Sequence, residues 1–150
     1  MRLLNRPLTI LSAVLLAALM SACRPTKAVL DKPIDFTDGY KLQESFHVPI
    51  RGTYYLAIGY NKDSQLQQNF ENPIDRFSVA FTLRNGSTVI KDATLVDPHD
   101  TVILRENYTI RVLCGFEGHP TRKYDLFLEI RKPEAELAST RPSVLILHGP

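Results

Sequence analysis

Hydrophobic and polar residues alternate in several short segments of this chain. In segment 53–60 every second residue is large and hydrophobic: Tyr54, Leu56 and Ile58. The same period of two recurs over 77–84, 108–116 and 124–130. Because successive side chains of a strand point to opposite faces, this period predicts β-strands, with polar residues on one face and hydrophobic residues on the other.

Turn signals separate these segments. Asn85-Gly86 lies between segment 77–84 and a return strand over 88–92, and it predicts a type I′ hairpin turn. Segment 43–50 contains Pro49, which predicts an edge strand, with Phe46, Val48 and Ile50 on its apolar side. The final hydrophobic run, 144–147, is expected to be buried on both faces or to pair at an edge.

Eight or nine short strands, together with at most one helical turn over 134–139, indicate an all-β protein. The expected fold is an antiparallel β-sandwich of immunoglobulin-like type. A small closed β-barrel is the alternative.

Segment 108–116 is the clearest amphipathic strand. Its even positions carry five apolar residues, which are Tyr108, Ile110, Val112, Cys114 and Phe116. We therefore expect Cys114 to be a structural, buried residue rather than a nucleophile activated by His119. Basic residues of this half of the chain, from Arg105 through Arg111 to Lys132, are expected on a solvated face of mixed charge.

Segment 61–76 breaks the alternation and predicts a long polar loop, with a short helix over 64–70 as the alternative. Long loops inside compact domains are often functional. Gln65, Gln68 and the large apolar Phe70 are the candidate residues for contacting a partner.

The N-terminus has the order of a secretion signal. Arg2 and Arg6 precede an apolar run from Leu8 to Leu19, which ends in Leu19-Met20-Ser21-Ala22-Cys23. A run of about 12 residues is too short for a transmembrane helix, which needs about 20. The pattern resembles the signal of bacterial lipoproteins, which implies that Cys23 is lipidated and becomes the mature N-terminus; a cleaved signal without lipid is the alternative.

This resemblance implies a signal peptide over 1–22. The composition of the next residues and the strand pattern then predict a lipidated tether over 23–40 and a β-sandwich domain over 41–150. Two acyl chains on Cys23 suffice for stable attachment to a bilayer. Arg24 follows the cysteine where an Asp would retain the protein at the inner membrane, so the periplasmic face of the outer membrane is the expected location.

Charge and motifs limit the possible functions. Loss of residues 1–22 removes two of 18 basic residues and leaves 16, against 16 acidic ones, so the mature chain is formally neutral. This balance argues against a nucleic-acid partner. The four histidines have no metal-ligand spacing, and neither a Gly-x-Ser-x-Gly elbow nor a phosphate loop occurs. No metal, cofactor or catalytic residue is expected.

The segments Phe46-His47-Val48-Pro49 and 52–58 resemble a family of small proteobacterial lipoproteins with an immunoglobulin-like domain of unknown function. The expected function is non-enzymatic binding of a periplasmic protein, as an immunity protein or an accessory subunit of an envelope complex. The alternative is a periplasmic hydrolase with a site assembled from His99, His119 and Glu117. A carrier of small ligands would need a cavity that the 128 residues left after loss of residues 1–22 can hardly enclose.

Replacement of Cys23 by Ser tests the anchor. The variant should lose both acyl chains and leave the membrane fraction while its domain stays folded, as measured by sedimentation and circular dichroism. A Cys23→Ser protein that still sediments with membranes would contradict the predicted attachment.

Overall fold

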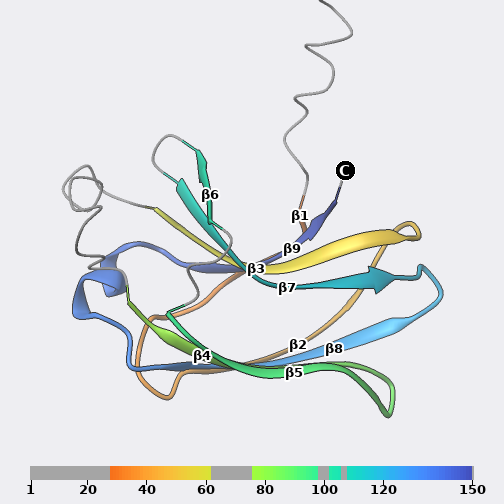
Figure 1. The fold of residues 1–150 in the computed structure, drawn as a ribbon, viewed down its shortest axis with the longest axis horizontal. Coiled ribbons are helices and arrows are strands. Elements are labelled where there is room, and N and C mark those ends of the chain that lie inside the picture. The colour runs from red at the N-terminus through yellow and green to blue at the C-terminus, as the bar shows by residue number, and fades with distance from the viewer. Residues whose placement is uncertain (1–27, 62–75, 98–101, 106–107, 150) are drawn as a thin grey trace, which may run out of the picture.

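The computed structural model describes residues 28–61, 76–97, 102–105 and 108–149. These residues form nine β-strands and one short 3-10 helix (Figure 1). The strands are β1 (Ala28–Pro33), β2 (Lys41–His47), β3 (Gly52–Asn61), β4 (Ser78–Asn85), β5 (Thr88–Val96), β6 (Val102–Arg105), β7 (Tyr108–Gly118), β8 (Lys123–Arg131) and β9 (Ser143–His148), with η1 (Ala135–Ser139) before β9.

The strands form two sheets that face each other (Figure 1). Sheet A has the order β1-β9-β3-β7-β6, and sheet B has the order β2-β8-β4-β5. Neighbouring strands are antiparallel in both sheets. Each sheet keeps two edge strands, so the predicted β-sandwich is confirmed and the closed barrel is excluded. The described ranges contain no helix that could span a membrane.

The core between the sheets is rich in aromatic rings. Phe116 of sheet A contacts Phe46 and Tyr124 of sheet B, with ring centroids 6.2 and 5.5 Å apart. Buried tyrosines need a partner for the hydroxyl group. Tyr54 donates to the Ile50 carbonyl at 2.9 Å, and Tyr124 accepts the backbone N–H of His119 at 2.8 Å. The buried tyrosines therefore also hold the β2–β3 and β7–β8 turns, which lie at the same end of the sandwich.

Strand β1 corrects the expectation that residues up to 40 form a tether. Ala28–Pro33 pairs with β9, and Ile34 and Phe36 are buried in the core. The Phe36 ring lies 5.7 Å from that of Tyr60 and 5.0 Å from that of Phe77. The proline and the charged residues of this segment gave no strand pattern in the sequence. Its pairing with β9 is what makes it part of sheet A.

Strand β9 lies inside sheet A, between β1 and β3. Its residues Val144, Leu145 and Ile146 are all buried. Of the two predictions for segment 144–147, burial on both faces is therefore correct and pairing at an edge is wrong. A strand that is buried on both faces is hydrophobic at every position, so its sequence does not alternate.

Strand β7 contains a β-bulge, so its residues do not all face the sides of the sheet that the alternation predicted. Leu56 pairs with Cys114, but the next residue, Ala57, pairs with Val112, so Leu113 is the extra residue. Because one inserted residue reverses the facing of a strand, Ile110 and Val112 lie on the outer face of sheet A with Tyr108. Thr109, Arg111 and Leu113 are buried, contrary to the expectation of a solvent-facing Arg111.

The hairpin between β4 and β5 is confirmed, but its turn differs from the predicted type I′. Asn85 pairs with Thr88, which leaves Gly86 and Ser87 as the loop. Gly86 has φ +58°, and Asn85 is not among the described residues with positive φ. Positive φ at the first loop residue alone is the pattern of a type II′ turn, which favours glycine there.

Strand β2 is an edge strand of sheet B, as Pro49 indicated. Phe46 and Val48 are buried as predicted, whereas Ile50 is 54% exposed, contrary to its assignment to the apolar side. The strand ends at His47, so the period of two does not extend to Ile50.

The contrast between Phe36 and Ile50 generates a stability prediction. Phe36→Ala should lower the free energy of unfolding by about 3–5 kcal/mol, because it leaves a cavity beside two rings. Ile50→Ala, the matched exposed control, should change it by less than about 0.5 kcal/mol. Urea unfolding of both variants measures this, and equal effects would contradict the assignment of Phe36 to the core.

Candidate functional site

The outer face of sheet B is the candidate site. In β8, Tyr124, Leu126, Leu128 and Ile130 point into the core, so the residues between them point outward. The pairings of β8 with β2 and β4 align further outward side chains beside them. We call this surface the B face; it comprises Lys41, Gln43, Ser45, Ala80, Thr82, Arg84, Asp92, Thr94, Asp125, Phe127, Glu129 and Arg131.

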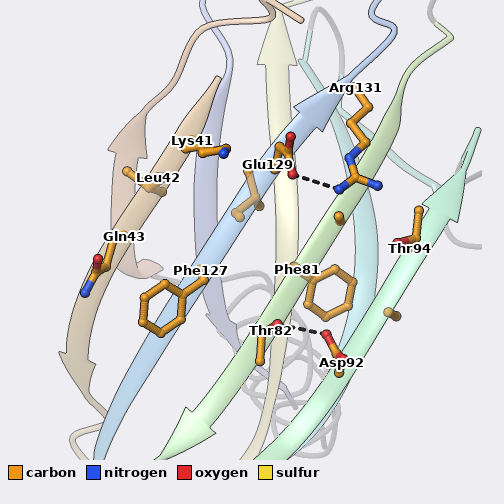
Figure 2. Close-up of a pocket in the computed structure, with 13 residues that line it drawn as sticks. Lys41, Leu42, Gln43, Phe81, Thr82, Asp92, Thr94, Phe127, Glu129 and Arg131 are labelled. Carbon is orange, nitrogen blue, oxygen red and sulfur yellow. Dashed lines mark hydrogen bonds and ion pairs between the residues drawn. The ribbon is translucent and has the colours of Figure 1, made fainter. Parts of the chain in front are cut away.

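A shallow hollow of about 510 Å³ crosses the middle of the B face (Figure 2). All four strands of sheet B contribute to its lining. The hollow is framed by charged and hydroxyl side chains, with Lys41 and Glu129 at one end and Thr82 and Asp92 toward the other (Figure 2).

Of the large hydrophobic residues that line this hollow, Phe127 is the exposed one, with 37% of its surface accessible. It pairs with Gln43 of β2 on one side and Thr82 of β4 on the other. The Arg84 guanidinium carbon lies 5.8 Å from the centre of the ring. An aromatic ring in the middle of a polar sheet face presents apolar area without exposing the core beneath it.

Polar contacts hold the side chains around Phe127. Arg131 Nη2 donates to Glu129 Oε2 at 2.8 Å, and Thr82 Oγ1 donates to Asp92 Oδ1 at 2.8 Å. The hydrogen bond from Arg131 lowers the pKa of Glu129. The face therefore offers an ordered set of donors and acceptors around one ring, an arrangement suited to surface recognition.

Phe127 is not among the site residues predicted from the sequence. It follows Leu126 and precedes Leu128, so it occupies an outward position of a strand whose inward positions are already filled by hydrophobic residues. A large aromatic residue on the face of an amphipathic strand where polar residues are expected is the sequence feature that could have identified it.

Most of the predicted site residues lie outside the described ranges. These are Cys23, the loop residues Gln65, Gln68 and Phe70, and His99 of the suggested hydrolase site. The structure therefore leaves both the lipid attachment and the loop as predictions.

Glu117 and His119, the other members of the suggested hydrolase site, have separate partners. Glu117 Oε1 accepts a hydrogen bond from Thr53 Oγ1 at 2.8 Å. His119 Nδ1 lies 2.9 Å from Thr121 Oγ1 in the turn after β7. Within the described part of the chain, no group of three or more His, Cys, Asp or Glu residues could hold a metal ion.

Cys114 packs against the core and is half-buried. Burial raises the pKa of its thiol to about 11, with Lys91 acting weakly in the opposite direction. A neutral thiol is a poor nucleophile. This agrees with the expected structural role of the residue.

Arg111 is 4% exposed and lies on the core side of β7. Its Nε donates to the Tyr60 hydroxyl at 2.6 Å, and its guanidinium carbon lies 5.9 Å from the centre of the Phe77 ring. Buried arginines are stable only when hydrogen-bonded or paired. Arg111 is therefore part of the core packing around Tyr60 and Phe77 and not of a solvated charged face.

No protein-family model matches the chain, and no curated protein matches it. Among solved structures, the fold is similar to the crystal structure of an uncharacterised protein from Sulfurospirillum deleyianum. The two share 13% sequence identity over 80% of this chain and 96% of the other, with a TM-score of 0.57. The similarity shows the fold alone, an all-β domain.

The raised pKa of Cys114 predicts slow alkylation. At pH 8 a thiol with a pKa of about 11 is about a hundredfold less ionised than one with a pKa of 9.0, so iodoacetamide should react about a hundredfold more slowly. The rate should rise about tenfold per pH unit up to pH 10 and recover in urea. Rapid alkylation of folded protein that carries Cys23→Ser would contradict this assignment.

Proposed function

We propose that this protein is a periplasmic lipoprotein, anchored through Cys23, that binds another protein with its B face and catalyses no reaction. The observation that carries the proposal is the exposed ring of Phe127 in the centre of an ordered polar surface. The signal sequence that ends at Cys23 supports the membrane anchor and the location at the periplasmic face of the outer membrane.

The composition of the B face supports a protein as the partner. Binding energy at protein interfaces is concentrated in a few central aromatic and arginine side chains, surrounded by a polar rim that excludes water. Phe127 with Arg84 supplies such a centre, and Lys41, Asp92 and Glu129 supply a rim with both signs of charge. A rim of mixed charge favours a partner of complementary pattern over a uniformly charged polymer.

The rigidity of the site also favours binding. The residues of the B face stand on four paired strands, so little chain entropy is lost when a partner docks. An immunity protein or an accessory subunit of an envelope complex would use such a preformed face.

Phe127→Asp is the test of this function. A charge in place of the ring should weaken capture of the partner by about 30-fold or more, the effect of losing a binding hot spot of about 2 kcal/mol. Ile50→Asp is the matched control, because Ile50 is also an exposed hydrophobic residue but lies outside the B face. The measurement is the affinity of each variant for the periplasmic protein that co-purifies with the wild type.

Two results would contradict the proposal. If Phe127→Asp captures the same protein with unchanged affinity, the B face is not the binding site. If Ile50→Asp weakens capture equally, the effect is not specific to Phe127. Circular dichroism of both variants separates loss of binding from loss of folding.

A further inference from the structure

The outer face of sheet A differs in chemistry from the B face. A second hydrophobic cluster lies there, separate from the main core, with Ala57, Ile110 and Leu145 buried at its centre. Partly buried hydrophobic residues surround this centre, namely Ala28, Tyr108, Val112 and Leu147. We call this surface the A face. It exists because the bulge in β7 turns Ile110 and Val112 outward.

Two tyrosines stand on the A face. Tyr55 pairs with Leu147 and Gly115. Its chain neighbours Tyr54 and Leu56 are buried in the core, so Tyr55 lies on the outer face of sheet A. The Tyr108 side chain lies over Gly59, where a Cβ would overlap its hydroxyl group. Tyr108 also lines a hollow of about 480 Å³ with Ala28, Asp31, Leu145 and Leu147. Tyrosine is enriched where proteins meet the interface of a bilayer, because its ring is apolar and its hydroxyl polar.

The chain reaches the sandwich at this same face. Ala28, the first residue of β1, belongs to the A-face cluster and pairs with Leu147. Four residues separate it from Cys23, so even a fully extended chain places Ala28 within about 18 Å of the lipidated cysteine. The headgroup layer alone accounts for several ångströms of this distance. A domain tethered so closely must present one of its surfaces to the membrane.

We infer that the A face rests against the lipid bilayer and that the B face points away from it, toward the periplasm. This inference depends on the proposed attachment at Cys23. Arg24 and Lys27, between the anchor and Ala28, add attraction to anionic headgroups. The B face lies on the opposite side of the sandwich, beyond a second sheet (Figure 1). Anchoring therefore leaves Phe127 accessible to a partner.

Fluorescence quenching by labelled lipid tests the orientation. The lipidated full-length protein, with Cys114→Ser, carries one fluorophore on a cysteine introduced either at Asp31 of the A face or at Thr94 of the B face. It is reconstituted into vesicles of phosphatidylethanolamine and phosphatidylglycerol with a nitroxide near the headgroup. Because packed sheets are about 10 Å apart, the label at residue 31 should be quenched about threefold more than the label at residue 94.

A matched pair of variants tests whether the hydrophobic surface causes the orientation. Leu147→Glu places a charge on the A face and should bring the quenching ratio close to one. Val96→Glu changes an exposed hydrophobic residue of sheet B, 72% exposed, and should leave the ratio unchanged. Circular dichroism confirms that both variants are folded.

The outcomes separate the inference from the function on which it rests. Equal quenching at both positions, or stronger quenching at residue 94, overturns the orientation while flotation of the vesicles with protein still supports the anchor. A label at residue 31 that is shielded from water but not quenched also overturns it, because a second copy or another protein then covers the A face. Failure of the protein to float with vesicles overturns both the anchor and the orientation.

Discussion

The bulge at Leu113 determines what both sides of sheet A can do. Without the extra residue, Ile110 and Val112 would continue into the core, and Arg111 would face solvent. With it, the guanidinium of Arg111 reaches the Tyr60 hydroxyl inside the sandwich, and two aliphatic side chains join an external cluster. One inserted residue thus produces a polar contact in the core and an apolar surface outside it.

Charged side chains stand at both open sides of the sandwich. Lys32 of β1 and Glu44 of β2 form an ion pair of 2.8 Å that connects the edge strands of the two sheets. At the other side, Lys91 of β5 pairs with Leu83, whose side chain is in the core, so Lys91 lies on the inner side of this edge strand while its side chain stays exposed. Inward-pointing charges protect edge strands from pairing with other chains. This protection disfavours strand addition at β5.

The two sheet faces have different chemistry, and the proposed roles follow from this difference. The B face has one exposed ring within fixed polar contacts, which suits specific recognition. The A face has a hydrophobic centre with two tyrosines and receives the chain from the predicted anchor. Because the core separates the faces, a protein can use one for the membrane and the other for a partner.

The strand-rich composition, the positions of most strands and the sandwich class could be predicted from the residues alone, because alternation is a local property of each strand. The sequence also carries the pattern that predicts a lipoprotein signal ending at Cys23. The tertiary structure alone decided the facing of β7, the membership of β1 and the exposure of Phe127. Each of these depends on which distant strand pairs with which, and a bulge such as that at Leu113 becomes visible only against its partner.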